Sequence, residues 1–184
     1  MRNPNSLCSI LVLAVSITLF PAILHAASAG DALTALKKFQ SRCETGISYR
    51  DYGAALADAN FQVKEFARSK EARQNPSLAH HISEALSHYK FAGFLWQLKI
   101  ESGNYSVGIY ENSAVWQAFL EMYPDGRVLM KHREYNGDDL GNVAFFSEII
   151  SYIWKQAGSE IEMADALASP STARKSSRAH NGPK

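Results

Sequence analysis

Apolar side chains recur every three or four residues through residues 78–100, and this pattern constrains the fold more than any other feature of the chain. The period matches the α-helix, so the side chains share one helical face for about six turns. Asn75 and Pro76 come just before it, and both residue types favour a helix start. A long helix with one apolar face must bury that face against neighbours. The stripe consists of Leu78, Ile82, Ala85, Tyr89, Ala92, Trp96 and Ile100.

Three further segments show the same period. We expect a first helix that opens at Asp31 as its N-cap and stops at Gly46. A second helix is expected to follow Ser48, which with Asp51 resembles a capping box with Asp in place of the usual Glu. A last helix is expected to begin near Asp138 or Asp139 and to run towards Ile161. Their stripes are Leu33, Leu36, Phe39 and Cys43, then Tyr52, Leu56, Ala59, Val63 and Phe66, then Val143, Phe146, Ile150, Ile153 and Ala157.

The pattern is weaker across residues 105–135. Residues 105–110 alternate as a short strand does, and residues 115–122 fit a short helix that ends at Pro124, Asp125 and Gly126. A β-hairpin across this turn would need a helix to lie on. The sequence therefore predicts a mainly α fold. We expect an antiparallel bundle of four to five helices, with a short β-hairpin or irregular segment near residues 105–135.

The beginning of the chain has the order of residues found in a secretory signal. Arg2 precedes an apolar run at residues 7–20, which Pro21 interrupts before the small residues that a signal peptidase accepts. We expect a signal peptide over residues 1–29, cut after Ala29, with Ala26 as the alternative. An uncleaved anchor is disfavoured because the run is shorter than the ~20 residues of a membrane-spanning helix. The mature protein is then periplasmic or secreted and has no transmembrane segment.

The charges divide the rest of the chain into two parts. The expected helical domain, residues 30–164, has 14 basic and 17 acidic side chains, which argues against nucleic-acid binding. Residues 165–184 are polar and basic and have little to bury, so we expect a disordered tail. Its basic side chains either contact an anionic surface or are solvated and have no partner.

Cys43 is the only cysteine left after removal of the signal peptide, so no internal disulfide can form. Its place on the first helical stripe favours a small buried apolar role, and an intermolecular disulfide is the alternative. No G-x-S-x-G motif is present, and enzymatic activity is not predicted.

His81, Glu84 and His88 are the weak candidates for a metal site, because their spacing places them on one helical face. The motif is not H-E-x-x-H, and a hydrated polar face explains it equally well, so no metal or cofactor is predicted. Residues 136–141 resemble a calcium loop, but Leu140 and Ser147 replace ligand oxygens. A turn followed by a helix cap explains them better. Residues 132–135 form a polar patch that is either a binding surface or a hydrated edge.

The aromatic side chains give the last indication of function in the sequence. Trp96, Trp116 and Trp154 stand on three expected elements and are suited to the core, whereas Phe94 and Phe145 fall off the stripes and could pack on a partner. The leading hypothesis is an exported, non-enzymatic binding module for an envelope protein or for a second copy of itself. The alternative is a small-molecule- or metal-binding bundle that uses the His81 face or a cavity between Trp96 and Trp154.

Overall fold

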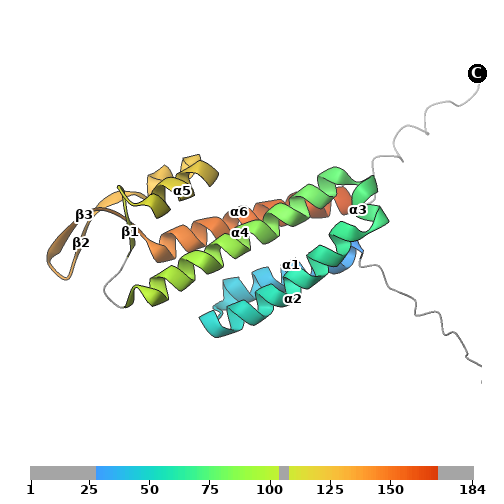
Figure 1. The fold of residues 1–184 in the computed structure, drawn as a ribbon, viewed down its shortest axis with the longest axis horizontal. Helices are drawn as coiled ribbons and strands as arrows, with labels where there is room; N and C mark the ends of the chain where they lie inside the picture. Colours follow the sequence, from blue (N-terminus) through green and yellow to red (C-terminus); the bar gives the residue numbers. More distant parts are fainter. Residues whose placement is uncertain (1–27, 104–107, 170–184) are drawn as a thin grey trace, which may run out of the picture.

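A computed structural model describes residues 28–103 and 108–169. Four long helices, α1, α2, α4 and α6, form an elongated bundle, and α5 and a small sheet lie at one end of it (Figure 1). The mainly α class with a short β segment is confirmed. The elements are α1 (Ala29–Thr45), α2 (Tyr49–Arg68), α3 (Lys70–Gln74), α4 (Pro76–Glu101), β1 (Gly108–Tyr110), α5 (Ala114–Met122), the 3-10 helix η2 (Pro124–Leu129), β2 (Lys131–Tyr135), β3 (Asp138–Phe145) and α6 (Phe146–Ala168).

Two of the sequence predictions concern the ends of the chain. Almost all of the expected signal peptide and residues 170–184 of the expected tail lie outside the described residues. The first part of that expected tail is helical, since α6 continues to Ala168. Asp165 in this part forms an ion pair with Lys37 at 2.6 Å. Among the helices that are described, none is long and apolar enough to cross a membrane.

The first helix begins earlier than the sequence pattern predicted. Ser28, and not Asp31, is the N-cap: its hydroxyl accepts a hydrogen bond from the Asp31 backbone N–H, and the Asp31 carboxylate accepts one from the Ser28 N–H. The reciprocal bonds satisfy two backbone donors at the start of the helix. Ala29 is 2% exposed, and its N–H donates to the Glu71 carboxylate at 3.1 Å. A cut after Ala29 would remove both Ser28 and Ala29 from this structure.

The other helix boundaries lie close to the predicted ones. Gly46 ends α1 with a positive φ of 92°, and Ser48 caps α2. Pro76 starts α4, but the Asn75 side chain donates to the Glu71 carbonyl and does not cap that helix. The short helix α3 was not predicted. Its cap is Ser69, whose hydroxyl accepts the Ala72 N–H.

The helical stripes meet in two buried clusters along the bundle. In the first, the Phe39 ring of α1 lies 4.9 Å from the ring of Tyr52 and 4.6 Å from that of Tyr89. The second surrounds Trp116 and Phe119 of α5, which pack on α4, α6 and the sheet. Apolar burial on this scale is the main source of stability for such a bundle.

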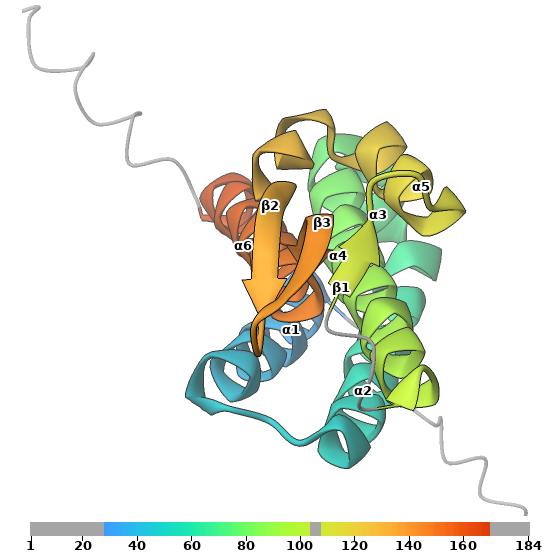
Figure 2. The same ribbon diagram turned by 90° about the vertical axis from the view of Figure 1, so that its left-hand side faces the viewer.

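The last helix begins later than predicted, because Asp138 and Asp139 belong to β3 and α6 starts only at Phe146. Asn136 and Gly137 form a two-residue turn with φ angles of 53° and 86°. Positive φ at both positions is typical of a type I′ hairpin turn. The turn joins β2 to β3, and the antiparallel sheet has the order β1-β3-β2. In Figure 2 this sheet lies across the near end of the bundle.

A hairpin across Pro124, Asp125 and Gly126, which the sequence allowed, is not formed. These residues begin η2. Gly126 is buried against Phe119, and a Cβ at this position would come 2.4 Å from the Phe119 ring. The tight 3-10 geometry and this contact hold the chain over α5, so the two strands form later in the sequence.

Candidate functional site

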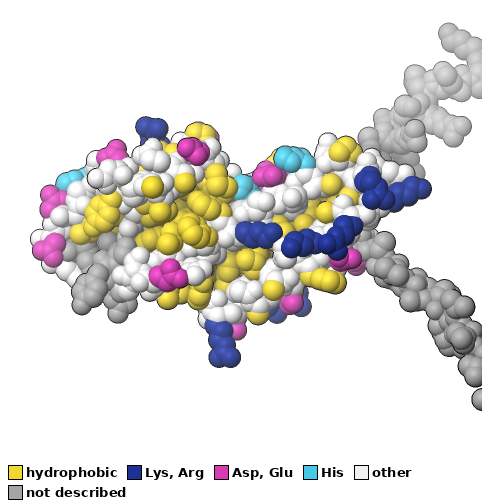
Figure 3. All heavy atoms as spheres, viewed as in Figure 1, with side chains coloured by type: hydrophobic (Ala, Val, Ile, Leu, Met, Phe, Trp, Pro, Cys, Tyr) yellow, Lys and Arg dark blue, Asp and Glu magenta, His cyan; other side chains and the backbone are white. Residues whose placement is uncertain are grey.

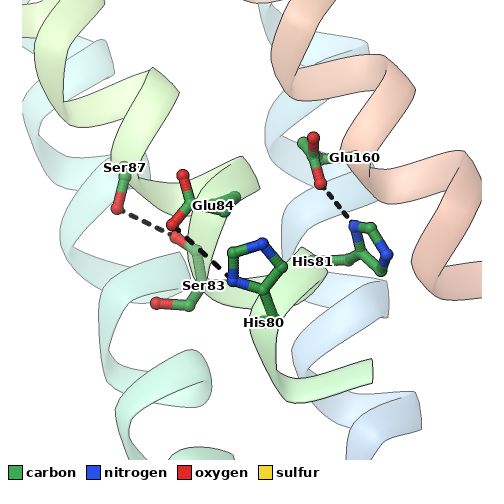
Figure 4. Close-up of polar contacts among 6 residues, drawn as sticks. All are labelled: His80, His81, Ser83, Glu84, Ser87 and Glu160. Atoms are coloured by element: carbon green, nitrogen blue, oxygen red, sulfur yellow. Dashed lines mark hydrogen bonds and ion pairs between the residues drawn. The ribbon is translucent and has the colours of Figure 1, made fainter. Parts of the chain in front are cut away.

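A polar seam between α4 and α6 contains the histidines that the sequence singled out. His81 Nδ1 lies 2.6 Å from Glu160 Oε2, and their side chains are 23% and 20% exposed. Figure 4 shows the His81 ring turned towards Glu160 on the neighbouring helix. A partly buried side-chain contact of this length ties the two helices together.

The other two candidates of the weak metal site have different partners. His88 Nδ1 lies 2.6 Å from the hydroxyl oxygen of Tyr123, and Glu84 lies 4.0 Å from the preceding histidine, His80. Figure 4 shows Glu84 beside His80 and apart from the contact between His81 and Glu160. The structure does not bring His81, Glu84 and His88 together. Within residues 28–103 and 108–169, no group of three His, Cys, Asp or Glu side chains is arranged to hold a metal ion.

Burial determines the protonation states of His88 and Tyr123. It lowers the pKa of His88, while the nearby carboxylates of Glu160 and Glu84 raise it by a smaller amount. Burial also raises the pKa of the Tyr123 hydroxyl, which stays protonated at neutral pH. The contact is therefore a hydrogen bond between a neutral imidazole and a neutral phenol.

The two tryptophans expected to line a cavity pack around Tyr52, and Trp154 also lines a hollow that does not include Trp96. The Trp96 ring centroid is 5.4 Å from that of Tyr52 and 5.8 Å from that of Trp154. Trp154 Nε1 donates to the Tyr52 hydroxyl at 3.3 Å, and this hydroxyl donates to the Tyr89 carbonyl oxygen at 2.7 Å. The contacts link α2, α4 and α6.

A hollow does lie nearby, between α1 and α6, and Cys43, Tyr89 and Trp154 are among its lining residues. The Tyr89 hydroxyl is buried and has no hydrogen-bond partner within the described protein. Cys43 is also buried, in agreement with its expected apolar role, and burial raises the pKa of its thiol to about 12. The thiol is therefore protonated and unreactive at neutral pH.

The polar patch predicted at residues 132–135 is partly turned inward. Arg133 Nη2 donates to both carboxylate oxygens of Glu148, at 2.7 and 2.8 Å, and its guanidinium lies 4.5 Å from the centroid of the Phe145 ring. Phe145 is thus covered by this chain's own Arg133, although the sequence suggested that it packs on a partner. His132 lies 3.3 Å from Asp139, which also accepts the Gly141 N–H at 2.7 Å. The segment that resembles a calcium loop is therefore part of a β-hairpin, with its turn at Asn136 and Gly137.

Phe94 differs from these residues because it remains exposed. The residue is 49% exposed, and its ring stacks on that of Phe91, with centroids 6.1 Å apart. Met122 of α5 is also 49% exposed, a feature that sequence reasoning missed because Met122 stands at a helix end. Figure 3 shows hydrophobic side chains gathered over α5 and the adjoining part of α4. We call Phe91, Phe94 and Met122 the α4–α5 apolar surface.

Comparison of the chain with protein-family models, curated proteins and solved structures finds no match.

Proposed function

We propose that this chain is an exported, non-enzymatic helical protein that acts as a binding or protein-interaction module in the cell envelope. The supporting observation is the half-exposed ring of Phe94. An exposed aromatic side chain that rests on another ring contributes a large apolar area when a partner covers it. Clusters of such side chains are typical of interaction sites.

The chemistry of the other candidates also supports binding over catalysis. His81 is paired with Glu160, and His88 is bonded to Tyr123, so both imidazoles already have partners inside the protein. Cys43 is a buried thiol with a raised pKa. These groups stabilise the contacts between helices, which leaves the α4–α5 apolar surface as the best-supported site.

Export through the predicted signal peptide makes a specific prediction about the mature N-terminus. Cleavage at the alternative site after Ala26 keeps Ser28 and Ala29, which cap α1 and contact Glu71. Loss of such a cap costs about 1 kcal/mol. We therefore expect the exported protein to begin at Ala27, and an intact mass of the secreted or periplasmic form measures this. A mature chain that begins at Gly30 would contradict the prediction.

The binding function can be tested by photo-crosslinking in cells that produce the protein. We expect benzoylphenylalanine in place of Phe94 to give a discrete covalent product with an envelope component after irradiation. The control places the same residue at Leu167, which is 52% exposed near the end of α6. Equal products at the two positions, or no product at Phe94, would count against the proposed function.

A further inference from the structure

Basic side chains line the face of the molecule that α2 and α4 share. Lys64 and Arg68 come from α2, Arg73 from α3 and Lys90 from α4, and all four are exposed. Arg73 Nη1 donates to the Arg68 carbonyl at 2.9 Å, which joins the last turn of α2 to α3. Figure 3 shows Lys and Arg side chains in a row along this face. We call these four residues the basic band.

The band holds like charges together with little compensation. Burial lowers the pKa of Lys90, and the charge of Lys64 across the α2–α4 contact lowers it further. Lys64 and Arg68 are also neighbours on one helix, four residues apart. Glu65, 2.8 Å from Arg68, is the one acidic side chain within ion-pair distance of the band in the described residues. An anionic partner would relieve this repulsion.

Exposed aromatic side chains accompany the cations on both helices. Phe94 follows Lys90 by four residues on α4, so the two share a helical face. Phe61 precedes Lys64 by three residues on α2 and is 61% exposed. A helix face that combines lysines with exposed phenylalanines is typical of attachment to a membrane surface, where the rings enter the boundary between headgroups and acyl chains.

We propose that the face formed by α2 and α4 binds an anionic lipid surface. Lys64, Lys90 and their basic neighbours contact headgroup phosphates, while Phe61 and Phe94 reach the acyl boundary. The inference rests on the proposed function and names its partner. Charge complementarity supports it, and so does the presence of one cation and one exposed ring on each helix. A planar headgroup layer can contact both helices at once.

The sequence that follows α6 contains further cations. Arg174, Lys175 and Arg178 come after the end of α6 at Ala168. Basic segments beside an anionic membrane each add attraction that falls off within a Debye length. The full chain is therefore the form to test.

Sedimentation with vesicles tests the proposal. We expect the full mature chain to bind phosphatidylcholine vesicles that contain phosphatidylglycerol, to bind pure phosphatidylcholine much more weakly, and to dissociate when salt is raised. Each lysine near an anionic surface strengthens binding about fivefold, so the double variant Lys64→Gln, Lys90→Gln should bind about thirtyfold more weakly. The double variant Phe61→Ala, Phe94→Ala should also bind more weakly.

The matched control removes the same charge elsewhere. Lys99 lies on α4 but about half a turn away from Lys90, and Lys131 lies on β2. The double variant Lys99→Gln, Lys131→Gln has the same net charge as the test variant and should keep most of the affinity. Circular dichroism verifies that both variants are folded.

Three results would overturn the lipid assignment. These are equal losses in the two lysine variants, no preference for phosphatidylglycerol, and lysine-dependent binding to soluble polyglutamate without binding to vesicles, which would indicate an acidic protein instead. If vesicle binding fails while crosslinking at Phe94 yields one protein, the proposed function stands and only its lipid partner is wrong. If both fail, both proposals are wrong.

Discussion

Replacing Phe39 with alanine is expected to lower the free energy of unfolding by about 4 kcal/mol. The Phe39 side chain is 1% exposed, and its ring makes edge contacts with those of Tyr52 and Tyr89. Alanine would leave a cavity where α1, α2 and α4 meet. Hydrogen bonds hold the Tyr52 hydroxyl in place, so the ring of Tyr52 cannot move fully into the cavity.

Urea unfolding followed by circular dichroism measures this loss, and Phe61→Ala is the matched control. The same atoms are removed there, but Phe61 is 61% exposed on α2, so we expect a change of about 0.5 kcal/mol or less. Similar losses for the two variants would mean that Phe39 is not in the core as described.

The helical part of the fold was predictable because its signals are local. The apolar period sets which face of each helix is buried, and Ser48, Gly46 and Pro76 act on backbone groups within one turn of themselves. Leu36, Val63 and Ile82 are buried as their stripes require. Ser28 was missed because Asp31 also fits a cap, and only the structure shows that the two residues form one capping box.

The hairpin of β2 and β3 was not located because two patterns overlap near its last strand. Val143 and Phe146 are three residues apart, as in a helix, yet Val143 lies in β3 and Phe146 begins α6. The acidic pair Asp138 and Asp139 also fits a helix start. Asn136–Gly137 was the signal for a hairpin, since these residues tolerate the positive φ that a type I′ turn needs.

The candidate sites depend on contacts that no local pattern contains. His81 meets Glu160, 79 residues later, and His88 meets Tyr123, 35 residues later. The proximity of Lys64 and Lys90 follows only from the packing of α2 on α4. Phe94 was found from the sequence because a ring outside the stripe has no place in the core of its own helix.

The structure also predicts how stability depends on pH through His88. Burial lowers the pKa of His88 in the folded protein below its usual value of about 6.5. As the pH falls below that value, the unfolded chain takes up a proton at this histidine that the folded chain does not. Stability is therefore lost on acidification, by at most about 1.4 kcal/mol per pH unit for this single group.

The variant His88→Gln isolates this effect, because glutamine keeps a hydrogen-bonding group near Tyr123 and does not titrate. Urea unfolding at neutral pH and about two units below it should show a smaller loss of stability for the variant than for the wild type. His81, His80 and the carboxylates of Glu84 and Glu160 remain in both proteins, so their contributions largely cancel in the difference. An equal or larger loss of stability in the variant would mean that the folded protein accepts a proton at His88 as readily as the unfolded chain does. That result would contradict a buried, neutral imidazole at this position.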